Sequence, residues 1–255
     1  MLWDVDYTLV DAGGVGLRLY RAAFAELYGR ELPEAAADAN MAGRTDRAIA
    51  IDVLALAGMP DPAGQVGAFE AALGRLAPKM TGLVASAGTT LPGAAAALAA
   101  LAGLPGVVQS LLTGNIRPLA EAKLAPLGLT AHLDLDVGAY GNEHAVRAEL
   151  VHLARERAGA AYHAGFGGAA TVLIGDTPLD IEAALVTGAR AVGVATGRFS
   201  LAELEAAGPH AALPDLTDTP GLVAAVLGGV RGAGGAGGAD QELDPGEELY
   251  QPRPA

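Results

Sequence analysis

The sequence predicts an α/β fold, in which a doubly wound, mostly parallel sheet carries a small inserted all-α cap domain. Three observations support this prediction. Short apolar runs alternate with segments of helical period, as in parallel sheets whose strands are connected by helices. Between Asp11 and about Pro92 the strand signal disappears and only helical patterns remain. Polar side chains follow the apolar runs, at the strand ends where such sheets bind their ligands.

The core domain is predicted to comprise residues 1–13 and 90–230. Its first strand is short, because only Leu2 and Trp3 precede the first acidic residue, Asp4. Four further apolar, β-prone runs are predicted to be strands, and three segments are predicted to be helices, of which the last two have apolar positions spaced three and four apart. The strands cover 107–112, 132–139, 171–176 and 190–196, and the helices cover 117–128, 144–159 and 178–188.

Residues 14–89 are predicted to form the helical cap domain. Amphipathic patterns at 15–32, 45–58 and 65–83 are separated by Pro and Gly and follow the first strand directly. The cap is therefore expected to lie over the strand ends. Residues 231–255 are rich in Gly, Pro and acidic residues and contain almost no large apolar side chains, so they are predicted to be a disordered tail.

Composition narrows the classes of partner. The 255 residues carry a formal net charge of −13, which disfavours nucleic acid and anionic membrane surfaces as partners. The negative net charge does not exclude an anionic small substrate, because a bound cation can make the local charge of the site positive. The absence of cysteine excludes disulfides, thiolate metal sites and a cysteine nucleophile. No run is long and apolar enough to span a bilayer and no signal peptide is recognised, so a cytoplasmic protein is expected; the oligomeric state is left open.

Polar residues that suit phosphate chemistry gather at the predicted strand ends. Carboxylates, a cation, a threonine and a backbone amide beside glycine together suit a phosphoryl group bound with a hard metal ion. They occur in DVDYT, LLTGN, the start of the helix at 144–159, and GDTPLD, as Asp4, Asp6, Thr8, Thr113, Gly114, Asn115, Arg147, Asp176 and Asp180.

These motifs, in this order over about residues 1–225, resemble those of the haloacid dehalogenase (HAD) superfamily of phosphotransferases. The helical insertion between the first two motifs resembles the cap of phosphoglycolate phosphatase-like members. The resemblance implies that Asp4 is a nucleophile that forms an aspartyl-phosphate. It implies that Asp6 protonates the leaving oxygen and then deprotonates the hydrolytic water.

The resemblance also implies a phosphate site and a metal cofactor. Thr113 and the Gly114 amide would bind the phosphoryl oxygens, with Thr8 and Asn115 as further residues of this site. Mg²⁺ would be held by Asp4, the main-chain carbonyl of Asp6, and Asp176, with Asp180 orienting Asp176 or the metal-bound waters. On the residues alone, Asp176 and Asp180 also fit an ordinary helix cap and a first-turn acid.

Three positions differ from the family motifs or lie outside them. Position 7 is Tyr where the family usually has Gly. The third motif usually supplies a Lys; Arg147 is the first candidate for this cation and Lys123 the second, although a place on a helix surface is expected for Lys123. In MAGRTD, Arg44 resembles a cap arginine that faces the site and is a candidate for binding a substrate carboxylate or a second phosphate. A solvated Arg44 beside Asp46 is the equally weighted alternative.

The predicted function is a Mg²⁺-dependent phosphatase that hydrolyses a small phosphorylated metabolite. A catalytically degenerate scaffold with a binding or regulatory role is one alternative, motivated by Tyr7 and the missing lysine. A phosphomutase is the other. Retention of Asp4, Asp6 and Asp176 favours the enzyme.

Overall fold

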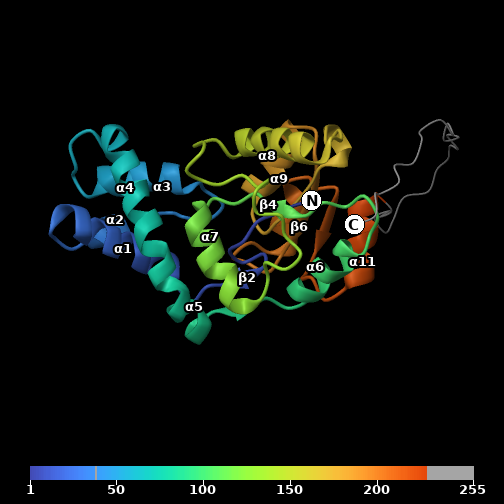
Figure 1. Ribbon diagram of the computed structural model, residues 1–255, viewed down its shortest axis with the longest axis horizontal. Helices are drawn as coiled ribbons and strands as arrows, with labels where there is room; N and C mark the ends of the chain where they lie inside the picture. Colours follow the sequence, from blue (N-terminus) through green and yellow to red (C-terminus); the bar gives the residue numbers. More distant parts are fainter. Residues whose placement is uncertain (38, 229–255) are drawn as a thin grey trace, which may run out of the picture.

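The core of the protein is a five-stranded parallel sheet with helices on both faces, as Figure 1 shows. The computed structural model describes residues 1–37 and 39–228; the predicted tail at 231–255 lies outside the described residues. The strand order is β4-β1-β5-β6-β7, and every pair of neighbours is parallel. The strands are β1 (Leu2–Trp3), β4 (Ser110–Leu111), β5 (Val172–Gly175), β6 (Arg190–Val194) and β7 (Ala211–Leu213). The predicted fold class is confirmed.

The apolar core forms two layers, one on each face of the sheet, because successive side chains of a strand point to opposite faces. Trp3 and Ile174 pack on one face with helices α6 (Ala94–Ala102), α7 (Arg117–Leu124) and α11 (Thr219–Leu227). Leu2 and Leu173 pack on the other face with α8 (Arg147–Tyr162), α9 (Pro178–Val186) and α10 (Leu201–Ala206). Short 3₁₀ helices η2 and η3 cover Ala125–Leu127 and Gly168–Ala170.

Five helices lie together at one side of the molecule, in blue to teal in Figure 1. They are α1 (Val15–Tyr28), α2 (Glu34–Ala37), α3 (Asp46–Leu56), α4 (Pro62–Leu76) and α5 (Thr81–Ala87), with the 3₁₀ helix η1 (Ala77–Met80) between the last two. Strands β2 (Val10–Asp11) and β3 (Thr89–Thr90) pair antiparallel. The chain therefore enters and leaves this helical region at one place.

Two expectations about single elements were wrong, and one strand was missed. Residues 132–139 form turns and contribute only an isolated bridge between Ala139 and Leu112. The reason is local: the Asp134 carboxylate accepts a hydrogen bond from the Asp136 backbone N–H, which offers the chain an alternative to strand pairing. The segment 65–83 is divided among α4, η1 and α5, and strand β7 was not predicted.

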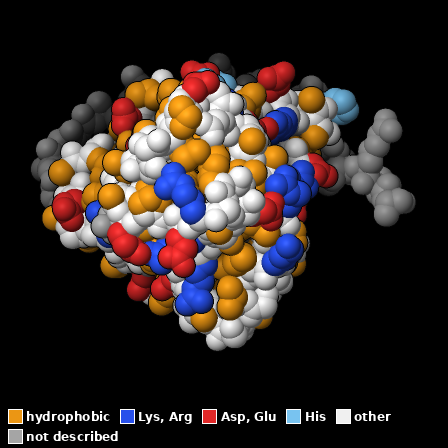
Figure 2. Space-filling view, turned by 90° about the vertical axis from the view of Figure 1, so that its left-hand side faces the viewer, with side chains coloured by type: hydrophobic (Ala, Val, Ile, Leu, Met, Phe, Trp, Pro, Cys, Tyr) orange, Lys and Arg blue, Asp and Glu red, His pale blue; other side chains and the backbone are white. Residues whose placement is uncertain are grey.

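The outer face of the helical region carries charges of both signs among apolar side chains (Figure 2). Two of its ion pairs, Arg21–Glu34 and Arg75–Glu26, have N–O distances of 3.1 and 2.7 Å. Within the described residues, no helix combines the length and the apolar character needed to cross a bilayer.

Candidate active site

The site begins at the end of the central strand, β1. Because β1 lies between β4 and β5, the segments that follow all three strands meet at one edge of the sheet. The Asp4 N–H donates to the Ile174 carbonyl at 2.9 Å, which continues the ladder by one residue and directs the Asp4 side chain into the site. Asp4 is only 5% exposed.

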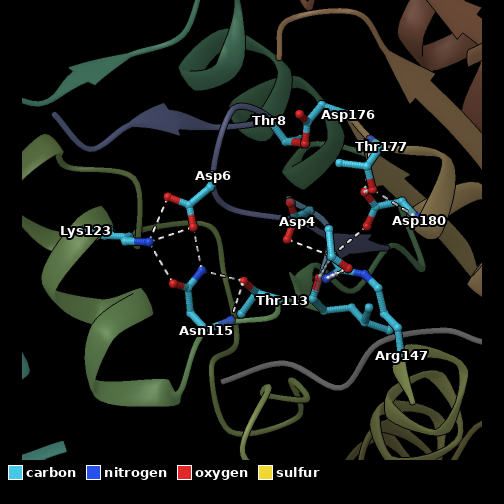
Figure 3. A network of polar contacts seen from close by, with 12 residues as sticks. Asp4, Asp6, Thr8, Thr113, Asn115, Lys123, Arg147, Asp176, Thr177 and Asp180 are labelled. Carbon is cyan, nitrogen blue, oxygen red and sulfur yellow. Dashed lines mark hydrogen bonds and ion pairs between the residues drawn. The ribbon is translucent and has the colours of Figure 1, made fainter. Parts of the chain in front are cut away.

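Arg147 lies at the centre of the first polar cluster, as Figure 3 shows. Its Nη2 atom is 2.7 Å from Asp4 Oδ1 and 2.6 Å from Asp180 Oδ1, and it donates to the Leu112 carbonyl at 3.2 Å. The residue is buried, so these contacts replace its hydration. Burial lowers the pKa of Arg147, but the carboxylates of Asp180 and Asp4 outweigh burial and raise it. Arg147 therefore remains a cation bound to the predicted nucleophile.

Asp6 belongs to a second cluster and points away from Asp4 (Figure 3). Lys123 Nζ donates to both Asp6 carboxylate oxygens, at 2.7 and 2.6 Å, and to Asn115 Oδ1 at 2.7 Å. Asn115 Nδ2 completes the triangle with a 2.8 Å bond to Asp6 Oδ2. The expectation that Lys123 lies on a helix surface was wrong, since its side chain is 4% exposed.

Residues after β4 leave two donors available. Thr113 Oγ1 accepts hydrogen bonds from the Asn115 side chain at 2.7 Å and from the Asn115 N–H at 3.2 Å. Its own O–H is therefore free to donate, and the Gly114 N–H has no partner within residues 1–37 and 39–228. A side chain at Gly114 would overlap the Arg44 carbonyl. Two donors beside Asp4 suit the oxygens of a phosphoryl group.

The loop after β5 supplies the remaining acids. Thr177 caps α9, and its side chain and backbone N–H form a capping box with Asp180. Asp180 is therefore the first-turn acid that the alternative interpretation expected, whereas the cap is Thr177 and not Asp176. The second carboxylate oxygen of Asp180 contacts Arg147. Asp176 accepts a hydrogen bond from Thr8 at 3.3 Å. A Cβ atom at Gly197 would overlap Asp176 Oδ2, so the absence of a side chain there leaves this carboxylate room.

Three buried acids lie close together beside a single guanidinium. Ligand atoms of Asp4, Asp176 and Asp180 lie within 4.8 Å of one another. Burial, with the neighbouring acids, raises the pKa of Asp176 to about 9. Burial also raises the pKa of Asp4 to about 7, despite the opposing effect of Arg147. When ionised, three carboxylates against one guanidinium leave two negative charges, and oxygen ligands of this kind fit a divalent hard cation.

A cavity of about 650 Å³ opens in front of Asp4. The cavity is lined by charged residues of the sheet edge and by residues of the helical region. The charged residues are Asp4, Asp6, Asp176, Lys123 and Arg147. The residues of the helical region are largely apolar and include Val15, Leu17, Met41 and Ile49. The cavity therefore joins a charged end to an apolar wall, as small-molecule sites commonly do.

Arg44 lies on the cavity wall, where it pairs with Asp52 at 2.7 Å rather than with Asp46. Asp46, which the sequence analysis treated only as a neighbour of Arg44, is buried. Its carboxylate accepts from the Tyr20 hydroxyl and from the Ile116 N–H, both at 2.7 Å. Asp46 thus links α1 and α3 to the start of α7. Sequence reasoning missed this role, since Asp46 reads as an ordinary first-turn acid.

Comparisons with known proteins agree with this architecture. Residues 1–185 match the family model described as haloacid dehalogenase-like hydrolase. The protein named "Probable phosphatase IndB" from Dickeya dadantii (strain 3937) is 31% identical over 141 residues, which cover 55% of this chain and 58% of that protein. The match thus spans little more than half of the curated relative.

Solved structures show the same fold. A hydrolase from Pseudomonas syringae superposes with a TM-score of 0.58 at 21% identity, over 87% of this chain and 96% of that one. A protein from Lactobacillus plantarum described as "putative phosphoglycolate phosphatase" gives a TM-score of 0.58 at 16% identity, over 87% and 97% of the two chains.

Proposed function

Because this chain belongs to the haloacid dehalogenase-like hydrolase family, we propose that it is a Mg²⁺-dependent phosphatase acting on a small phosphorylated metabolite. The observation that carries the proposal is the position of Asp4, which is buried at the central strand end, paired with Arg147 and open to the cavity. The proposed division places a cap of residues 14–89 over a core of residues 1–13 and 90–230. The pairing of β2 with β3 supports this division.

In the proposed reaction, Asp4 attacks phosphorus and forms an aspartyl-phosphate as the leaving oxygen departs. Arg147 binds Asp4 Oδ1, while Oδ2 has no hydrogen-bond partner among the described residues and is the attacking oxygen. The Thr113 hydroxyl and the Gly114 amide hold the phosphoryl oxygens. Positioning of this kind supplies most of the catalysis in phosphoryl transfer.

Asp6 is the proton carrier in both halves of the reaction. It donates a proton to the leaving oxygen and later takes one from the water that attacks the aspartyl-phosphate, so the proton balance closes over one turnover. Its side chain is 36% exposed and borders the cavity, so a substrate oxygen and water have access to it. Lys123 and Asn115 hold the carboxylate away from Asp4.

Asp4 and Asp176, with the main-chain carbonyl of Asp6, are the proposed Mg²⁺ ligands. When bound there, the ion neutralises charge on the nucleophile and on the phosphate. Asp180 holds Arg147 and the α9 cap, and so orients the acids rather than binding metal directly.

The test is hydrolysis of p-nitrophenyl phosphate with and without Mg²⁺ by wild type, Asp4→Asn and Asp136→Asn. Asp136 is a matched control, because its side chain is 83% exposed and pairs with Arg117 away from the cavity. We expect Mg²⁺-dependent turnover that Asp4→Asn abolishes and Asp136→Asn preserves. Equal turnover in all three proteins would exclude Asp4 as the nucleophile. A folded, Mg²⁺-replete wild type without turnover would favour a phosphomutase or a degenerate scaffold.

A further inference from the structure

Tyr7 adopts a backbone conformation that tyrosine rarely adopts. Its φ angle is 56°, in the left-handed region. Among the described residues, only Asp61 and His163 share a positive φ without being glycine, and Asp and His tolerate this region better than Tyr does. A glycine would meet the same backbone requirement without strain. The tyrosine therefore costs stability, and a residue retained at such a cost suggests a role for its side chain.

The surrounding structure enforces this conformation. The Tyr7 N–H donates to the Val10 carbonyl at 2.7 Å, and the Tyr7 carbonyl accepts from Thr196 Oγ1 at 2.5 Å. The first bond closes the tight turn after Asp6, and the second attaches this turn to the loop after β6. These two bonds involve only the backbone of position 7, so they fix its conformation whichever side chain is present.

The side chain of Tyr7 does nothing evident for the fold. It is 48% exposed and lines the cavity. Its hydroxyl makes no hydrogen bond, and its ring stacks on no other aromatic ring, within the described parts of the chain. A large ring usually stacks on another ring or packs in an apolar core, and among the described residues Tyr7 belongs to neither an aromatic pair nor a core cluster. The partner of this ring is therefore sought in the cavity.

The cavity indicates what that partner is. Its volume of about 650 Å³ lies in the range of sites for drug-sized ligands, well above what a phosphate with a two-carbon chain fills. Beside the acids and the basic residues, its wall includes an apolar stretch from the helical region, with Val15, Leu17 and Ile49. A bulky apolar leaving group fits this space, and a planar one gains most from an aromatic wall.

We infer that Tyr7 is a specificity-determining residue that packs against a flat ring in the leaving group of the substrate. The substrate class is then a phosphate monoester whose alcohol or phenol carries a planar ring. This inference rests on the proposed phosphatase function for the reaction, and on the cavity alone for binding.

The experiment compares benzyl phosphate with cyclohexylmethyl phosphate, whose leaving alcohols are both primary and differ mainly in ring planarity. We expect wild type to favour benzyl phosphate in kcat/KM. Tyr7→Phe keeps this preference, whereas Tyr7→Leu and Tyr7→Gly lower it about three- to tenfold, the range measured for aromatic pairing. Tyr7→Gly also raises Tm by roughly 2–4 °C, since it relieves backbone strain. His163→Gly is the control, with a higher Tm and an unchanged preference.

A binding measurement separates this inference from the proposed function. Calorimetric titration with benzylphosphonate and cyclohexylmethylphosphonate reports ring preference without turnover. A Tyr7-dependent preference in a protein that hydrolyses no monoester would support the inference and overturn the phosphatase. Turnover with no ring preference, or with a preference that survives Tyr7→Leu, would overturn the inference alone. Absence of both turnover and ring-selective binding would overturn both.

Discussion

Replacement of Lys123 by methionine is expected to impair proton transfer more than phosphate binding. Lys123 Nζ lies 2.7 and 2.6 Å from the Asp6 oxygens and 2.7 Å from Asn115 Oδ1. Removing one partner of a fully buried pair costs about 3–5 kcal/mol. Because the Asp6 side chain is 36% exposed, water replaces part of the lost contact, and we expect Lys123→Met to cost about 1–2 kcal/mol of stability. The variant should therefore fold.

The effect on catalysis depends on the leaving group. General acid catalysis contributes about 10²–10⁴-fold, and only a poor leaving group needs all of it. With Asp6 no longer held, kcat/KM for benzyl phosphate is expected to fall about 100-fold or more. For p-nitrophenyl phosphate, whose phenolate departs without a proton, the fall should stay below about tenfold.

Lys79→Met is the matched control, because Lys79 is the other lysine of the chain and is exposed. It should leave both rates unchanged. In an Asp6→Asn background, Lys123→Met should add less than about threefold, since the two residues act together. Equal losses on both substrates would refute this reasoning and indicate that Lys123, rather than Arg147, supplies the cation that acts on the phosphate.

Three further predictions concern the other contacts of the site. Arg147→Lys keeps the charge but cannot reach all the acceptors of the guanidinium, so kcat for p-nitrophenyl phosphate should fall about 10–100-fold in a folded protein; an unchanged kcat would exclude its proposed role. Protons compete with Mg²⁺ at Asp4 and Asp176, because the pKa values of these acids are raised to about 7 and about 9. Calorimetry should therefore show that Mg²⁺ affinity rises from about pH 6 to about pH 9 and that binding releases protons. An affinity that does not change with pH would contradict the assignment of these two ligands. Asp46→Ala leaves the buried Ile116 N–H unpaired and leaves the Tyr20 hydroxyl only its 3.1 Å bond to the main-chain carbonyl of position 46. It should cost about 1–3 kcal/mol in urea unfolding, against less than about 0.5 kcal/mol for the exposed Glu34→Ala; equal costs would mean that the buried link contributes little.

The sheet and the acids at its edge could be predicted from the sequence, because the carboxyl ends of all parallel strands lie at the same edge. An apolar run followed by an acid places that acid at the carboxyl edge, whichever neighbour the strand pairs with. Asp4 and Asp176 therefore lie together in the structure although 172 positions separate them, and the motif order indicated this. Arg147 likewise begins its helix beside Asp4.

The remaining features depend on contacts that local patterns do not report. Residues 132–139 alternate like a strand, but Asp134 binds a nearby backbone N–H and the segment turns. Lys123 was expected on a surface, yet it shares the spacing of Ile116, Leu119 and Ala120, all buried on one side of α7. That spacing was the available signal. No comparable pattern marked Asp46, whose partners come from distant segments.

The most direct test of the account is chemical trapping of the intermediate on Asp4. Wild type would be mixed with p-nitrophenyl phosphate and Mg²⁺, quenched during turnover and treated with borohydride, which reduces an acyl phosphate to an alcohol. Mass spectrometry of the peptide containing Asp4, Asp6 and Asp11 should then find homoserine at position 4 alone, and only in samples that received substrate. Homoserine at another position, or none in a protein that is turning over, would contradict an aspartyl-phosphate on Asp4.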